Sequence, residues 1–121
     1  MNEKRAELEA LAERVEREEP SRDMDAAIAR AIGWRQHPMV EGFAVAPSWT
    51  TSLDAAVTLV PSGYATTISL NPDGTAIASM WREEPFIPAP TILHSKPRLP
   101  AAAALTAAAL RALAQEAADG H

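Results

Sequence analysis

The segment 101–118 constrains the fold of this chain most strongly, because eleven of its 18 residues are alanine. Alanine has the highest helix propensity, and Pro100, directly before the segment, suits the first position of a helix. An apolar face runs along the predicted helix and consists of Leu105, Ala109, Leu110 and Leu113. Because alanine lets a neighbouring backbone approach closely, we expect this helix to lie flat on a sheet or on another helix.

The same alanine content limits the core. The chain has 121 residues and is 47% hydrophobic, which is ordinary for a soluble globular protein, but few of these side chains are large. This length predicts one small domain that buries about two-thirds of its unfolded surface. The absence of cysteine excludes disulfides, thiol nucleophiles and thiolate metal sites. Residues 1–19 are charged throughout and no apolar run approaches the ~20 residues of a membrane span, so we expect a cytoplasmic protein with no membrane contact.

The charge is unevenly distributed along the chain. The net charge is −5, and residues 1–25 contain nine acidic and five basic side chains. Between Gln36 and Trp81 there is no lysine or arginine. Because sequence-independent nucleic-acid binding needs basic side chains that meet phosphates, we expect no direct binding to nucleic acid.

The acidic beginning of the chain predicts a helix over residues 3–19, which Pro20 ends. Leu8, Leu11 and Val15 form a narrow apolar stripe on this helix. So narrow a stripe buries little area, so we expect the helix to dock loosely or against a second copy, which would make the protein a homo-oligomer. We therefore divide the chain into an acidic helix at 1–20 and a single domain at 21–121.

Two further helices have recognisable ends. Residues 22–32 form the first, with Ser21 as its amino-terminal cap and Gly33 at its left-handed stop. The second begins with the capping pattern Thr51-x-x-Asp54 and ends before Pro61.

A hairpin follows these helices. Residues 64–70 and 75–81 are rich in threonine, isoleucine and aromatic side chains, and Asn71-Pro-Asp-Gly74 between them predicts a type I turn. The register stays open by one residue. Apolar side chains occur on both faces, which favours a sheet that is covered on both sides. The proline-rich arm at 85–100 is either an extended segment along the sheet edge, with a third strand at 91–94, or a binding loop.

Two segments carry a resemblance to a known family: Asp25-Ala-Ala-Ile-Ala-Arg-Ala-Ile-Gly-Trp34, and Ser48-Trp-Thr-Thr-Ser-Leu-Asp-Ala-Ala-Val-Thr-Leu-Val-Pro-Ser-Gly-Tyr64. Together they resemble the small phage and prophage proteins that contain the phage ABA-sandwich domain. The resemblance covers residues 23 to about 114 and implies helix–sheet–helix layering, but it carries over no functional residues. We therefore predict a small α+β sandwich with a short antiparallel, hairpin-based sheet between helices.

Catalytic and metal-binding patterns are weak in this sequence. Its histidines, which include His37 and His94, do not have the spacing of metal ligands, so we expect neither a metal nor a cofactor. A serine–histidine–acid trio could be drawn from Ser48 or Ser52 with His94 and Asp54, but almost any protein offers such a set. Glycine-rich phosphate loops are absent. We expect no catalytic site and a non-enzymatic function, with an uncharacterised hydrolase as a minor alternative.

Aromatic residues at the ends of the predicted helices and strands are the feature that points to a binding site. The candidate ligand or interface residues are Trp34, Arg35, Trp49, Tyr64, Trp81 and Arg82. These rings either line a shallow pocket for a planar anion, form the centre of a protein interface, or complete the core of an alanine-rich domain. We predict a phage or prophage accessory protein that binds a host or defence protein. The alternative is sequestration of a small nucleotide-type ligand in an aromatic pocket.

Overall fold

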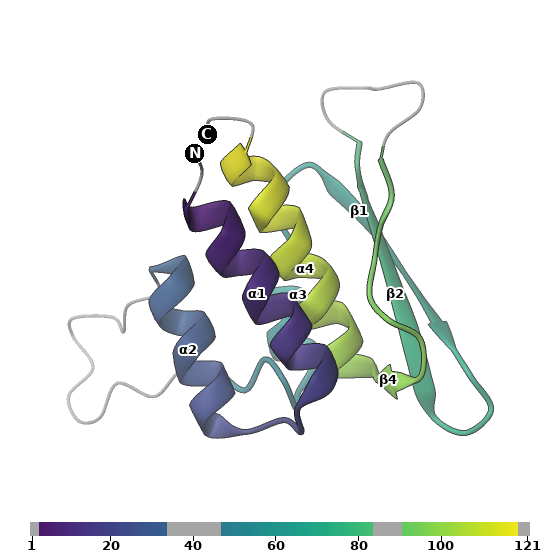
Figure 1. The fold of residues 1–121 in the computed structure, drawn as a ribbon. Helices are drawn as coiled ribbons and strands as arrows, with labels where there is room; N and C mark the ends of the chain where they lie inside the picture. The colour runs from purple at the N-terminus through teal and green to yellow at the C-terminus, as the bar shows by residue number, and fades with distance from the viewer. Residues whose placement is uncertain (1–2, 34–46, 84–90, 119–121) are drawn as a thin grey trace.

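Four helices and a small antiparallel sheet make up the part of the chain that the computed structural model describes, which is residues 3–33, 47–83 and 91–118 (Figure 1). In chain order the elements are α1 (Glu3–Arg17), α2 (Arg22–Ile32), α3 (Leu53–Val57), β1 (Tyr64–Leu70), β2 (Thr75–Arg82), β3 (Leu93–His94), β4 (Leu99–Pro100) and α4 (Ala101–Ala118).

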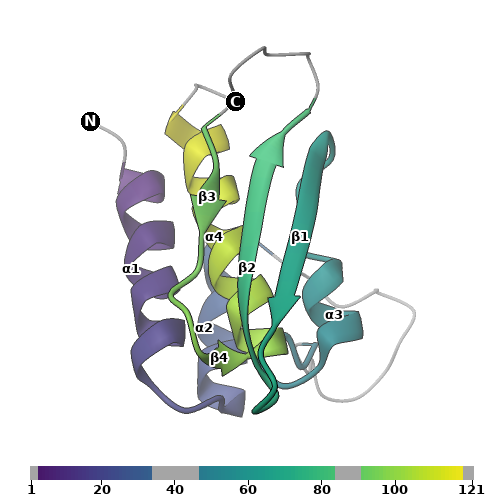
Figure 2. The same ribbon diagram turned by 90° about the vertical axis from the view of Figure 1, so that its right-hand side faces the viewer.

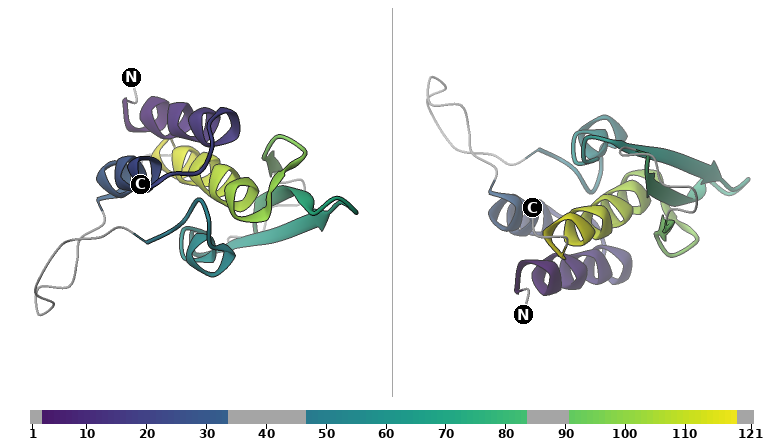
Figure 3. Two further views of the ribbon diagram at one scale, coloured as in Figure 1. Left: turned by 90° about the horizontal axis from the view of Figure 1, so that it is seen from below. Right: turned by 90° about the horizontal axis from the view of Figure 1, so that it is seen from above.

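The alanine-rich helix α4 lies at the centre of the fold. It packs against α1 on one side and against the sheet on the other, and α3 also contacts it (Figures 1 and 3). Every residue from Ala102 to Leu110 is buried. A helix surrounded in this way needs small side chains on all its faces, which explains why alanine dominates its sequence.

The sheet is built on the predicted hairpin. β1 and β2 pair antiparallel from Tyr64 opposite Arg82 to Leu70 opposite Ala76, which resolves the open register. The turn is confirmed, because the Gly74 amide donates to the Asn71 carbonyl at 3.0 Å and Gly74 has a φ of 88°.

The proline-rich arm runs along the second edge of β2. β3 pairs with β2 at Ser79 and Met80, and β4 pairs with β2 at Thr75 and Ala76. For residues 91–100 this confirms the interpretation of an extended segment along the sheet edge; residues 84–90 lie outside the described part.

The predicted α+β class, layered helix–sheet arrangement and hairpin-based sheet are confirmed, but the described helices cover only one face of the sheet, and not both as expected (Figure 2). α1 and α2 form the outermost layer, α4 the next, and the sheet lies against α4 (Figure 1). Ala76, Ala78 and Met80 are fully buried and face α4, so the alternate residues of β2 point to the opposite face. Among the described elements no helix lies over that opposite face.

The acidic helix α1 belongs to the same core. Leu8, Leu11 and Val15 are only 3%, 6% and 3% exposed, because they pack inward with α4. This stripe, which we expected to dock loosely or against a second copy, is thus covered tightly within one chain. α1 is also tied to α4 by the carboxylate of Glu16, which accepts hydrogen bonds from the Arg111 guanidinium at 2.5 and 2.6 Å.

The two segments that carry the family resemblance hold each other. The carboxylate of Asp25, on α2, accepts hydrogen bonds from the amide and the hydroxyl of Thr50, both at 3.0 Å. Arg22 donates to Asp25 at 3.1 Å and to the Ser48 hydroxyl at 2.7 Å. These contacts hold residues 47–52 against the amino-terminal end of α2. Trp49, which lies between Ser48 and Thr50, is thereby directed into the core.

The helix ends agree with the sequence at α2 and differ at α3. Ser21 caps α2 by accepting from the Met24 amide at 3.0 Å, and Gly33 ends that helix with a φ of 75°. The cap of α3 is Ser52 and not Thr51. Ser52 has the extended backbone that a cap requires, and its hydroxyl accepts from the Ala55 amide at 3.3 Å.

Candidate functional site

The described helices leave the face of the sheet opposite α4 uncovered (Figure 2), and we call it the outer face. The strand register places these residues on it: Ala65, Thr67 and Ser69 of β1, Thr75, Ile77, Ser79 and Trp81 of β2, His94 of β3 and Pro100 of β4. Ala65 lies opposite Trp81 and Ser69 lies opposite Ile77. Ile77 and Trp81 are partly exposed, so this face combines apolar side chains with hydroxyl groups.

A serine–histidine contact lies in the middle of the outer face. The Ser79 hydroxyl and the Nδ1 atom of His94 are 2.9 Å apart, and both residues face solvent. Within the described residues no carboxylate contacts His94, so the pair lacks the acid that orients a catalytic histidine. It acts as a hydrogen bond that joins β2 to β3.

The hydrolase trio considered from the sequence is not assembled. Ser48 accepts a hydrogen bond from Arg22, Ser52 caps α3, and His94 contacts Ser79. Each of these three residues is engaged in a different part of the fold.

Tyr64 and Arg82 meet at one end of the sheet, on the face that α4 covers. They are directly opposite each other in the β1–β2 register, and the Arg82 guanidinium lies 5.8 Å from the centre of the Tyr64 ring. Arg82 also forms an ion pair with Glu116, and the Tyr64 hydroxyl donates to Gln115 at 3.2 Å. Burial raises the pKa of Tyr64 above its usual value, although the hydrogen bond from Arg82 opposes this shift. These two candidate residues are therefore engaged with each other and with α4.

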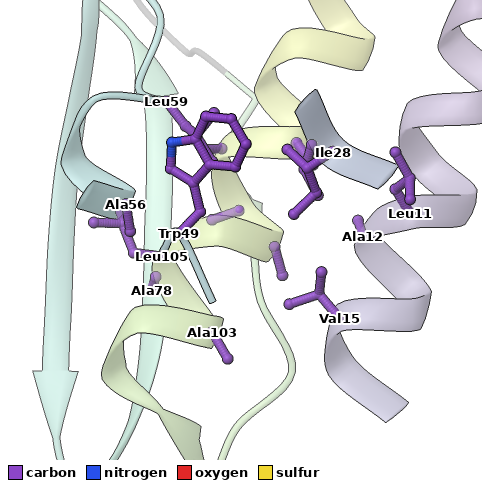
Figure 4. Packing of buried hydrophobic residues seen from close by; sticks show 14 of the residues in the cluster. Leu11, Ala12, Val15, Ile28, Trp49, Ala56, Leu59, Ala78, Ala103 and Leu105 are labelled. Carbon is purple, nitrogen blue, oxygen red and sulfur yellow. The ribbon is translucent and has the colours of Figure 1, made fainter. Parts of the chain in front are cut away.

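Trp49 and Trp81 occupy different environments. Trp49 is only 1% exposed and packs among Ile28, Leu59 and Leu105 (Figure 4). Its indole nitrogen donates to the Thr58 hydroxyl at 3.2 Å. The ring thus supplies bulk to an alanine-rich core and offers no surface to a ligand, whereas Trp81 lies on the outer face. The other two candidates, Trp34 and Arg35, lie outside the described residues.

Sequence reasoning missed the exposed apolar side chains beside the free edge of β1. Leu53 and Val57 on α3 are 41% and 54% exposed, and Leu70 at the end of β1 is 70% exposed. Ala56 on the same helix is fully buried, so α3 buries only some of its apolar side chains. The sequence does indicate that this helix is short, because it lies between Ser52 and Pro61, and a short helix can bury only part of its apolar face.

Hollows lie on the helical side of the part of the chain that the structure describes, and two of them border α1. The larger, of about 370 Å³, is bounded by the first turns of α1 and the last turns of α2 and α4. Leu8, Ile32 and Leu113 form apolar walls, and Lys4 and Arg30 contribute positive charge. The smaller, of about 280 Å³, lies between α1 and α2. Neither Trp49 nor Trp81 lines either hollow.

The described residues show no other chemical centre. No group of three or more histidine, aspartate or glutamate side chains in ranges 3–33, 47–83 and 91–118 could hold a metal ion. Of the helices described, none has the length and apolar character to cross a membrane.

Comparisons with protein-family models, with curated proteins and with solved structures found no match to this chain. The resemblance to the phage ABA-sandwich family stays a prediction from the sequence.

Proposed function

We propose that this chain is a non-enzymatic binding protein, of the phage or prophage accessory kind, which engages a host or defence protein through the outer face of its sheet. One observation carries the proposal: Trp81 and Ile77 lie on a sheet face that no described helix covers. The phage origin rests on the resemblance of the segments 25–34 and 48–64 alone.

The composition of the outer face supports a protein partner. Tryptophan at the centre of an interface buries a large ring and contributes a disproportionate share of the binding energy. Around Trp81 and Ile77, the side chains of Thr67, Ser79 and His94 supply hydrogen-bonding groups. An apolar centre with a polar rim is the usual composition of a protein–protein interface.

A small anionic ligand in the larger hollow is the second candidate. The positive charges of Lys4 and Arg30 favour an anion, and the volume of the hollow lies at the lower end of the range for small-molecule sites. However, the carboxy-terminal ends of α2 and α4 also border this hollow, and helix carboxy termini repel anions. Lys4 already contacts Glu7 at 3.0 Å and the Ala31 carbonyl at 2.6 Å. The charge pattern therefore favours the protein partner.

Affinity purification from phage-infected cells tests the proposal with three versions of the chain. We expect one host protein to co-purify stoichiometrically with the wild type and with Trp81→Phe, which keeps an aromatic ring. The same protein should be lost with Trp81→Ser, whose fold is checked by circular dichroism. Hydrogen exchange of the purified complex should then show protection of β1 and β2. Undiminished capture by folded Trp81→Ser, or protection confined to α1 and α2, would refute the proposed surface.

The ligand alternative is tested separately by thermal unfolding with a panel of nucleotides. A ligand at a hundredfold above its Kd stabilises the folded protein by about 2.7 kcal/mol. A shift of that kind that disappears in Arg30→Gln would support the hollow, and no shift with any nucleotide would reject it.

A further inference from the structure

The outer edge of β1 is an open sheet edge. β3 and β4 cover the other side of β2, whereas no strand among the described residues pairs with the outer side of β1. The Glu83 amide donates to the Gly63 carbonyl and the Asn71 amide donates to the Thr75 carbonyl, both at 2.7 Å. In an antiparallel pair these bonds occur at every second residue, so the backbone amides and carbonyls of the odd-numbered residues of β1 point toward β2. The amides and carbonyls of Thr66, Ile68 and Leu70 therefore point outward.

This edge lacks the usual protection against strand pairing. β1 is seven residues long, Tyr-Ala-Thr-Thr-Ile-Ser-Leu, and contains neither a charged residue nor proline. Natural edge strands are commonly short, charged or interrupted by proline. The opposite edge has these features, because β3 and β4 are two residues each and are separated by Lys96 and Pro97.

Exposed apolar side chains lie next to the open edge. α3 is beside β1 and in the same layer as α4, so a strand added to β1 would extend the sheet over α3 (Figures 2 and 3). Leu53 and Val57 are four residues apart and share one face of α3, where both are exposed. An added strand would lie next to α3 and beside Leu70, which is itself exposed (Figure 2).

We propose that β1 pairs antiparallel with β1 of a second copy, about a two-fold axis at Thr67. In this register Thr66 lies opposite Ile68 of the second copy, and Tyr64 lies opposite its Leu70. The outward-pointing amides and carbonyls of Thr66 and Ile68 of one strand then meet those of Ile68 and Thr66 of the other. A two-fold interface must be self-complementary in this way. Thr67 meets Thr67 of the second copy on the outer face, and pairs of β-branched residues stabilise neighbouring strands.

The distribution of charge favours a second copy as the occupant. β1 is uncharged, and α3 has one charged residue, Asp54. The acidic helix α1 lies on the other side of α4 from β1 (Figure 1). A neutral edge thus meets a neutral edge without like-charge repulsion, whereas a charged strand from another protein would find no counter-charge on β1.

Pairing at β1 would also join the outer faces of two copies into one continuous surface with two Trp81 side chains. That consequence rests on the proposed function, but the pairing itself does not. The mass of the purified chain tests self-association without any partner, so its failure and the failure of host binding are separate results.

The experiment uses charge at position 67, which is exposed and lies on the proposed axis. The molar mass of the full chain is measured by size-exclusion chromatography with light scattering over a concentration series. We expect the wild type and Thr67→Gln to be dimers. Thr67→Lys and Thr67→Glu place like charges directly opposite each other and should each be monomers. A mixture of the lysine and glutamate variants should restore the dimer, because opposite charges then meet.

Three results would overturn the pairing: a wild type that is monomeric up to its solubility limit, charged variants that are dimeric by themselves, or a mixture that stays monomeric. A second pair of variants tests the backbone bonds. Thr66→Pro removes an outward amide and leaves the β1–β2 bonds intact, whereas Thr66→Ala keeps that amide. The dimer should be lost in the proline variant and kept in the alanine variant. Equal masses for these two folded variants would also contradict the proposal.

Discussion

Replacing Glu16 with glutamine removes the charge that ties α1 to the rest of the fold. The carboxylate accepts two hydrogen bonds from Arg111 on α4 and a third, at 2.7 Å, from the Lys96 amide between β3 and β4. Its side chain is fully enclosed, whereas that of Arg111 is 24% exposed. Glutamine keeps the shape and one acceptor oxygen, but it leaves a partly buried guanidinium without its counter-charge.

The magnitude follows from these contacts. Removing one member of a buried ion pair costs about 3–5 kcal/mol, because the remaining charge stays uncompensated. Arg111 is partly hydrated and keeps its hydrogen bond to the His94 carbonyl at 3.1 Å, so the loss is smaller. We expect Glu16→Gln to lower the free energy of unfolding by about 2–3 kcal/mol and Tm by about 10 °C. This is a large share of the ~5–15 kcal/mol that stabilises a typical domain.

The pH dependence gives the same prediction a second readout. Burial by itself would raise the pKa of Glu16, but the hydrogen bonds from Arg111 and Lys96 outweigh it and hold the pKa below its usual value of 4.5. The unfolded chain therefore takes up this proton at a higher pH than the folded one. The stability that Glu16 contributes is complete above pH 4.5 and is lost as the pH falls through the lower folded pKa.

Urea denaturation followed by circular dichroism at neutral pH and at about pH 3 measures both effects. Glu9→Gln, on the exposed side of α1, is the matched control and should change stability by less than about 0.5 kcal/mol. The difference between the wild type and Glu16→Gln should narrow at acid pH. A difference below about 1 kcal/mol at neutral pH, or one that is independent of pH, would refute the assigned role of Glu16.

Three other substitutions have expected outcomes that denaturation curves can check. Asp25→Ala leaves the buried amide and hydroxyl of Thr50 without an acceptor and should cost about 2–4 kcal/mol; a loss under 1 kcal/mol would show that residues 47–52 are held by other contacts. Gly74→Ala places a side chain at a φ of 88° and should cost about 1–2 kcal/mol; no loss would mean that the turn relaxes. Ala108→Leu adds bulk to a fully buried position of α4 and should cost about 1–3 kcal/mol; a more stable variant would show that α4 packs loosely.

Local signals in the sequence predicted most of the secondary structure. Ser21 and Gly33 fixed the ends of α2, Pro100 marked the start of α4, and the Asn71–Gly74 turn located the hairpin. Each of these signals acts through the backbone conformation of the residue itself or of its near neighbours, so a single sequence contains it.

Contacts between distant segments were not predictable in the same way. Nothing local shows that Glu16 would meet Arg111, 95 residues away, or that Ser79 would meet His94. For the candidate site, the sequence identified Trp81 but could not separate it from Trp49. One ring is in the core and the other is on the outer face because of how the layers stack. The periodicity of β2 alone could not indicate which face α4 covers.

The central position of α4 has a consequence for how the chain folds during synthesis. Residues 101–118 emerge from the ribosome after every other element described here, yet α1, α3 and all the strands pack against them. Until then, the apolar stripe of α1 and the inner face of the hairpin have no partner to bury them. These surfaces therefore stay exposed to solvent until α4 has been synthesised, so the tertiary structure forms late.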